Sequence, residues 1–165
     1  MAVQKADIFL KLDGVEGEAH DDKHKNEIEI QSSSLGVSNT GTFAAAGGGG
    51  SKHASFQDAH FTKYVDKSSP KLLLACATGQ HIKKAEITFR KAGQKEGQVE
   101  YLKYTLSDVL VSSFQESDHS GGDLALDQFS LNYAKIEVDY KEQKADGSLG
   151  GSIKAGYDLK AAKSS

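Results

Sequence analysis

The fold class is decided by one stretch of the sequence, Phe129-Ser130-Leu131-Asn132-Tyr133-Ala134-Lys135-Ile136-Glu137-Val138-Asp139-Tyr140. Apolar side chains alternate with polar ones along it, which is typical of a strand that buries one face. The large apolar residues occupy odd positions up to Tyr133 and even positions from Ile136 onward. One extra residue in a strand reverses the buried face in this way, so the pattern predicts a β-bulge at Ala134-Lys135.

The same period of two recurs on both sides of this stretch. Glycine-containing turns separate the runs, and residues 13–26 carry so few large apolar side chains that they predict a solvated loop. Residues 85–90 and 99–106 are expected to pair as a hairpin. The predicted strands lie at residues 8–12, 27–30, 53–60, 85–90, 99–106, 109–114, 129–140 and 153–159.

A single short helix is expected after Ser69-Pro70, with Ser69 as the N-cap, Pro70 in the first helical position and Gly79 at the end. Seven to nine strands with one short helix favour a mainly β fold. The predicted architecture is a small β-barrel of two closely packed curved sheets with one short flanking α-helix.

A low-complexity segment interrupts the strands between Val37 and His53. Its small side chains offer little surface to pack against a core, so it predicts a long projecting loop. The segment consists of Gly41, Thr42, Phe43, Ala44, Ala45, Ala46, Gly47, Gly48, Gly49, Gly50, Ser51 and Lys52.

Length and composition limit the function further. A chain of 165 residues predicts one domain over residues 1–165, and no apolar run approaches the roughly 20 residues of a membrane-spanning helix. The net charge is only −3, with acidic and basic residues interspersed, which is unlike a nucleic-acid-binding protein. Residues 1–12 lack the continuous apolar stretch of a cleaved signal peptide, so export would need another route.

No motif for catalysis, a cofactor or a metal stands out. His20, Asp21, Asp22 and His24 are the densest group of candidate metal ligands, but their spacing gives no reason for them to converge. The glycines before Lys52 lack the spacing of a phosphate-binding loop. We therefore expect no enzyme, no cofactor and no metal site; an enzyme would need distant residues such as Asp58, His60 and Ser112 to meet.

Several segments together resemble the Hcp (haemolysin-coregulated protein) family. The similarity extends from Val3 to about Leu159, with the segments in the same order and spacing. The segments are Phe61-Thr62-Lys63-Tyr64-Val65-Asp66-Lys67-Ser68-Ser69-Pro70-Lys71-Leu72, Arg90-Lys91-Ala92-Gly93, Val99-Glu100-Tyr101-Leu102, residues 131–140, and Gln143-Lys144-Ala145-Asp146-Gly147.

The resemblance implies a structural subunit of the type VI secretion inner tube. Six copies would form a hexameric ring, and the rings would stack into a tube that a contracting sheath expels. Effector proteins in the lumen and a spike protein of the VgrG kind are the other implied partners. The chain would be assembled in the bacterial cytoplasm and then secreted without a cleaved signal peptide.

The resemblance also implies roles for two segments. Ser34 matches a position on the inner wall of the ring that contacts effectors, and Ser32 is expected nearby, although an ordinary polar strand surface is an equal alternative. The segment 41–52 matches a loop that reaches toward the neighbouring ring, with a plain disordered loop as the alternative. The alternative function is a monomeric β-barrel that binds a small ligand or carbohydrate.

Overall fold

The computed structural model describes residues 7–39, 54–92, 97–122 and 124–165, and these residues are mostly in strands. The predicted loop 41–52 lies outside them. In chain order, the elements are β1 (Asp7–Leu12), β2 (Ile28–Ile30), β3 (Ser32–Ser34), β4 (Val37–Asn39), β5 (Ala54–Phe56), β6 (Ala59–Tyr64), α1 (Ser69–Thr78), β7 (His81–Ala92), β8 (Gln98–Ser117), β9 (Leu126–Gln143), β10 (Leu149–Asp158) and β11 (Lys163–Ser164).

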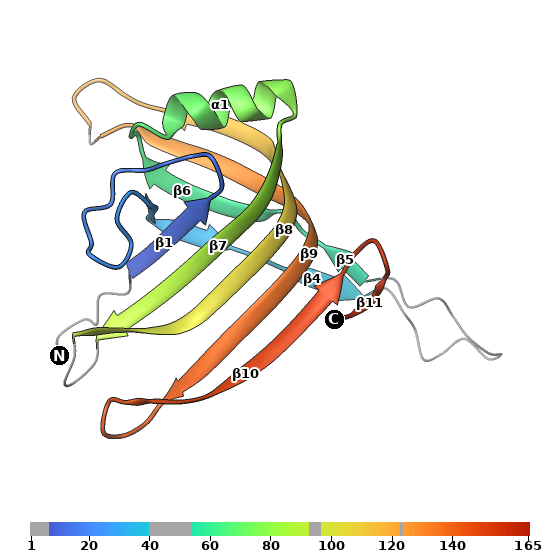
Figure 1. The fold of residues 1–165 in the computed structure, drawn as a ribbon. Coiled ribbons are helices and arrows are strands. Elements are labelled where there is room, and N and C mark those ends of the chain that lie inside the picture. The colour runs from blue at the N-terminus through green and yellow to red at the C-terminus, as the bar shows by residue number, and fades with distance from the viewer. Residues whose placement is uncertain (1–6, 40–53, 93–96, 123) are drawn as a thin grey trace.

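One strongly curved antiparallel sheet contains most of these strands (Figure 1). Its main path runs in the order β11-β10-β9-β8-β7-β1-β2, and β6 joins it by pairing with β9 and with β3. The strands β4 and β5 form a separate two-stranded ribbon. The hairpin expected from residues 85–106 is confirmed as the pair β7 and β8.

The sheet does not close into the predicted barrel. In the described residues β2 pairs with β1, whereas β3 pairs with β6. The two short strands are separated only by Gln31, whose backbone N–H donates to the carbonyl of Thr62 at 2.8 Å. The segment 28–34 thus changes partner halfway along, so the hydrogen-bond ladder is interrupted where a regular barrel would close. The mainly β class with one short helix is confirmed.

The strand β9 belongs to two parts of the sheet. Its first half, up to Leu131, pairs with β6, and its second half, from Lys135, pairs with β10. Its other edge pairs with β8 along nearly its whole length. The chain therefore turns a corner within one continuous strand, as sheets do when strands pass from one layer to another.

The predicted bulge at Ala134-Lys135 is wrong. The register between β8 and β9 continues unshifted past that point, and the irregularity in this pair lies instead between Val111 and Ser113. The buried face nevertheless reverses in both strands at the same level. In β8 the buried positions change from odd at Val109 to even at Leu106, and in β9 they change from odd at Tyr133 to even at Ile136. A shared reversal preserves the register, and Asp108, with φ of 53°, supplies the backbone change in β8.

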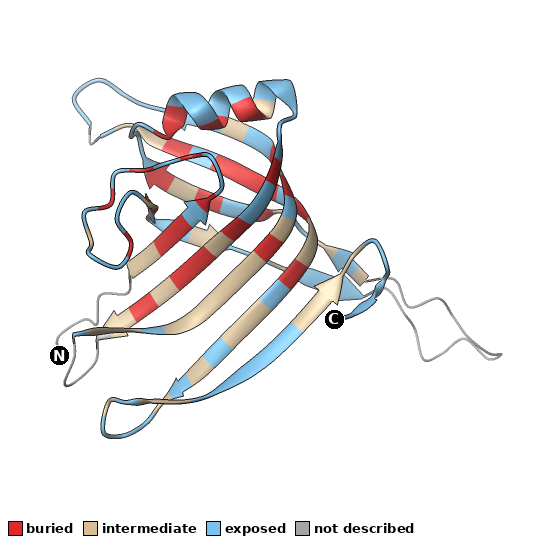
Figure 2. Ribbon diagram, viewed as in Figure 1, coloured by how far each residue is buried: buried red, intermediate tan, exposed pale blue. Residues whose placement is uncertain are grey.

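The core fills the concave side of the sheet beneath α1 (Figure 2). The helix begins at Ser69 and ends before Gly79, which adopts the left-handed conformation at φ 63°, as predicted. The N-cap is Ser68 and not Ser69, because the side chain of Ser69 contacts buried charged groups instead. Leu72 and Ala75 face the core.

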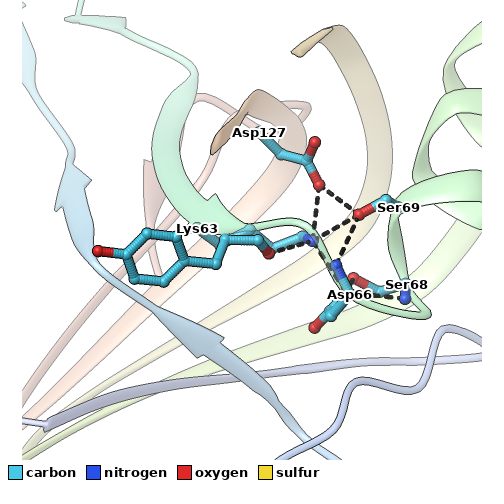
Figure 3. A network of polar contacts seen from close by, with 6 residues as sticks. Lys63, Asp66, Ser68, Ser69 and Asp127 are labelled. Carbon is cyan, nitrogen blue, oxygen red and sulfur yellow. Dashed lines mark hydrogen bonds and ion pairs between the residues drawn. The ribbon is translucent and has the colours of Figure 1, made fainter. Parts of the chain in front are cut away.

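A buried polar network fixes the start of the helix to two strands (Figure 3). Lys63 of β6 and Asp127 of β9 are fully buried, with Nζ 2.7 Å from Oδ2. The same ammonium group donates to Asp66 Oδ1 at 2.9 Å and to Ser69 Oγ at 3.0 Å. Ser69 Oγ also donates to Asp127, so one lysine connects β6, β9 and the first turn of α1.

The substitution Lys63→Met should strongly destabilise the fold. It leaves the Asp127 carboxylate buried without its counter-ion, which typically costs about 3–5 kcal/mol. The double variant Lys63→Met, Asp127→Leu removes both charges and should recover much of that loss. Urea unfolding followed by circular dichroism measures both, and a single variant as stable as the wild type would contradict this role for Lys63.

Candidate functional site

Uncharged polar side chains form two rows across four neighbouring strands. Directly paired residues of adjacent strands share a face of the sheet, so the register defines each row. The four strands are β3, β6 and the ends of β9 and β8 that meet them. We call this surface the polar wall; its rows are Ser32-Thr62-Gln128-Gln115 and Ser34-His60-Ser130-Ser113.

The polar wall is exposed and slightly hollowed. All its residues except Thr62 and Ser130 are exposed, and an open hollow of about 760 Å³ is lined by every wall residue but Ser130. The alternate residues Phe61 and Phe129 are buried in the core behind it. Successive side chains of a strand point to opposite faces of the sheet. Burial of the phenylalanines in the core therefore places the neighbouring polar side chains on the exposed face.

Hydroxyl groups of the wall bond to one another. Ser32 Oγ contacts Thr62 Oγ1, and Ser113 Oγ contacts Ser130 Oγ. None of the wall residues is Asp, Glu, Lys or Arg, and His60 is the only one with an ionisable side chain. The wall can thus donate and accept hydrogen bonds without presenting a fixed charge.

The three residues considered for a catalytic site do not form one. Ser112 Oγ donates to Asp58 Oδ2 at 2.7 Å, and Asn132 Nδ2 donates to Oδ1 of the same carboxylate at 2.9 Å. No hydrogen bond among the described residues joins His60 to Ser112 or Asp58. The serine therefore has no histidine base in contact with it.

Tyr133 lies on the core side of β9 near this carboxylate. Its hydroxyl donates to the carbonyl of Gln57 at 2.9 Å. Burial, and secondarily the charge of Asp58, raises the pKa of Tyr133 to about 12. The phenol is thus a neutral hydrogen-bond donor behind the wall and supplies no reactive phenolate at neutral pH.

Two of the four candidate metal ligands in residues 20–24, Asp21 and His24, make internal contacts, whereas His20 and Asp22 are exposed. His24 is buried, stacks on Phe9 with ring centroids 4.5 Å apart, and contacts Glu27 and Glu100 through its two ring nitrogens. The Arg90 guanidinium donates to Asp21 at 2.8 Å and lowers the pKa of that carboxyl. Within the described residues, no three His, Cys, Asp or Glu side chains converge as a metal site would require.

The segment that contains these residues differs from its prediction. Residues 13–26 were expected to form a solvated loop, but Val15, Ala19 and His24 are buried in it. The loop also bonds to itself, with the N–H of Gly17 donating to the Asn26 carbonyl at 2.8 Å. The polar composition of the segment conceals this packing, because few of its side chains are apolar and buried.

Two of the eight wall residues were singled out by the family resemblance. Ser32 and Ser34 lie on β3 with exposed side chains. The other six come from strands distant in sequence, and their polar alternation with Phe61, Phe114 and Phe129 was the available signal. Only the strand register shows that they share one surface.

Comparison with known proteins defines the class. A family model described as "Type VI secretion system effector, Hcp" matches residues 9–140, which is most of the chain. The fold, with its exposed polar wall, is thus that of a type VI secretion system protein. The chain belongs to the Hcp family.

Individual relatives agree over nearly the full length. The chain is 44% identical to Protein hcp1 of Pseudomonas aeruginosa over 93% of its own length and 95% of that protein. Its fold matches a crystal structure of Hcp1 from Salmonella typhimurium with a TM-score of 0.78, at 37% identity, over 97% of this chain and 99% of that one. A structure titled "Structure of a type six secretion system protein" matches with a TM-score of 0.89, at 30% identity, over 98% of this chain and all of that one.

These comparisons confirm the tube-protein interpretation and give no support to the monomeric ligand-binding alternative. A structural role is consistent with the finding that Asp58, His60 and Ser112 do not form a catalytic arrangement. No helix in the described part of the chain has the length and apolar composition that a membrane crossing requires.

Proposed function

We propose that six copies of this chain form a ring whose lumen is lined by the polar wall, and that these rings stack into the inner tube of the secretion apparatus. The observation that carries the proposal is an exposed four-stranded surface with no fixed charge on a chain of the Hcp family. A lumen that carries different proteins benefits from such a surface, because it forms adaptable hydrogen bonds without rejecting either sign of charge.

Within the wall, Ser32 and Ser34 are proposed to contact effectors. Both side chains are exposed on β3, and its pairing with β6 is confined to Ser32–Ser34. The hydroxyl of Ser32 contacts Thr62, whereas Ser34 lies opposite His60. The two serines would therefore present hydroxyl groups at the side of the wall farthest from β8.

The lumen position of Ser34 can be tested by labelling. A Ser34→Cys variant in a Cys76→Ala background should react with a small maleimide in both dissociated subunits and tubes. A maleimide on a large polymer should react only with the dissociated subunits, because the bulky chain is excluded from a narrow lumen. The extent of labelling is read by mass spectrometry.

A matched variant controls this experiment. Lys71→Cys in the same background places the thiol at an exposed position on α1, outside the polar wall. It should react with both reagents in tubes. Equal reaction of Ser34→Cys with the large reagent in tubes and in subunits would contradict a lumen position.

The segment 41–52 is proposed to contact the adjacent ring. It joins β4 to β5, whose pairing of Asn39 with Ala54 holds its two ends side by side. Its small side chains allow another backbone to approach closely. Such a contact would join rings without contributing to the core of the subunit.

Replacing residues 40–53 with Asn-Gly should leave rings intact and abolish tubes. A two-residue Asn-Gly turn suits an antiparallel hairpin and would connect Asn39 directly to Ala54. Electron microscopy distinguishes rings from tubes. A control that changes Gly47–Gly50 to serines retains the length; unchanged tubes from the shortened variant would remove the stacking role.

The remaining partners follow from the same proposal. The tube would be assembled in the bacterial cytoplasm inside a contractile sheath and would carry a VgrG-like spike at its tip. Effector proteins would travel in the lumen. Sheath contraction would then secrete the tube, so that the chain needs no cleaved signal peptide.

A further inference from the structure

The strands β4 and β5 form a ribbon that two short links join to the main sheet. Leu35-Gly36 connects β3 to β4, and Gln57-Asp58 connects β5 to β6. The ribbon therefore extends the β3–β6 pair beyond a joint of two residues in each strand (Figure 1). Its direction relative to the sheet depends on what holds these links.

Apolar packing keeps the ribbon close to the core. The ring of Phe56 in β5 lies 5.0 Å from that of Tyr157 and 6.4 Å from that of Tyr133, measured between centroids. The hydrophobic effect that favours such contacts is not directional. Hydrogen bonds depend on angle, so bonds made by the links can fix the direction of the ribbon.

The link between β5 and β6 is bonded to β9 on both of its faces. Asn132 and Tyr133 are consecutive residues of β9, so their side chains point to opposite faces of the sheet. The Tyr133 hydroxyl donates to the Gln57 carbonyl at 2.9 Å. The Asn132 amide donates to Asp58 Oδ1 at 2.9 Å. The two residues of the link are thus held from the core side and from the side of the polar wall.

The second oxygen of Asp58 bonds to an irregular position of β8. The register of β8 against β9 shifts between Val111 and Ser113, so Ser112 is the extra residue of a β-bulge. Its hydroxyl donates to Asp58 Oδ2 at 2.7 Å. A bulge changes the direction of a side chain, and this one directs a hydroxyl toward the link.

A carboxylate suits this position because it accepts hydrogen bonds at both oxygens. Bonds to a charged acceptor are also stronger than bonds between neutral groups. The two donors, Ser112 and Asn132, come from different strands, so rotation of the joint would lengthen at least one of the bonds to Asp58.

We infer that Asp58 is a positioning residue that fixes the direction of the β4–β5 ribbon, and with it the place at which the segment 41–52 meets the adjacent ring. The second part of this inference rests on the proposed stacking role of that segment, whereas the first part does not. The carboxylate acts through the ribbon, whose paired ends Asn39 and Ala54 hold the two ends of the segment.

The direction of the ribbon can be measured within one full-length chain. Spin labels on Ser38→Cys of β4 and Lys71→Cys of α1, in a Cys76→Ala background, report the distance between ribbon and helix in dissociated subunits. Both labelled positions are exposed. Double electron–electron resonance should give one narrow distance distribution when Asp58 is present. The substitution Asp58→Ala should broaden it, because both bonds to the joint are lost.

Two further variants show whether the hydrogen bonds are responsible. Asp58→Asn should keep the distribution narrow, because an amide can accept from Asn132 and bond to Ser112. The matched control Asp146→Ala removes a carboxylate that bonds to Ser148 in the turn between β9 and β10, and it should also leave the distribution narrow. A narrow distribution from Asp58→Ala, or one from Asp58→Asn as broad as that expected for alanine, would overturn the inference.

Circular dichroism verifies that each variant folds. If Asp58→Ala does not fold, Ser112→Ala replaces it. That variant leaves the carboxylate bonded to Asn132 alone and should broaden the distribution, and an unchanged distribution would overturn the inference.

Electron microscopy of unlabelled chains tests the consequence for stacking. Asp58→Ala should form rings but no tubes at concentrations at which the wild type forms both, and Asp58→Asn should form tubes. If Asp58→Ala forms tubes while the variant shortened at residues 40–53 forms none, the stacking part of the inference is overturned and the role of the segment stands. Tubes from the shortened variant would remove that role, and the distance measurement would still decide whether Asp58 fixes the ribbon.

Discussion

The structure depends on the continuous pairing of β8 with β9 around a corner. The two strands reverse their buried face at the same level, between Val109 and Leu106 and between Tyr133 and Ile136, so their ladder continues while the sheet changes direction. On one side of the corner, β9 pairs with β6 and presents the polar wall. On the other side, it pairs with β10. A single pair of strands thus connects the surface proposed to face cargo with the part of the sheet that contains β10.

Burial of apolar side chains supplies most of the stability of such a sheet, but the Lys63–Asp127 pair determines how α1 is attached to it. A fully buried ion pair contributes less to stability than its geometry suggests, because both charges lose their hydration. It does discriminate between arrangements, since a shift of α1 relative to β6 or β9 would remove the Ser69 hydroxyl from both buried charged groups. The start of the helix and the end of the wall are therefore held at a fixed distance. A tube built from repeated subunits requires that constancy of shape.

Much of this fold could be predicted from the sequence, because alternation reports which residues are buried. The helix from Ser69 to Gly79 and the β7–β8 hairpin follow from local signals. The failure of the sheet to close into a barrel could not be predicted, because nothing in the sequence around Gln31 shows that the residues on its two sides pair with different strands. The parity change was visible in the sequence but was interpreted as a bulge at Ala134-Lys135, because a single strand cannot show that its partner reverses as well. In the candidate site, Ser32 and Ser34 followed from the family resemblance, whereas Gln115 and Gln128 required the strand register.

The chain acts through its surfaces, as a repeating structural subunit. The most direct test is the mass of the particle formed by the purified wild-type chain, measured by native mass spectrometry over a range of concentrations. The expected result is a closed species of six times the 17.6 kDa chain, followed by larger multiples of that ring. A chain that remains at 17.6 kDa at every concentration would contradict it.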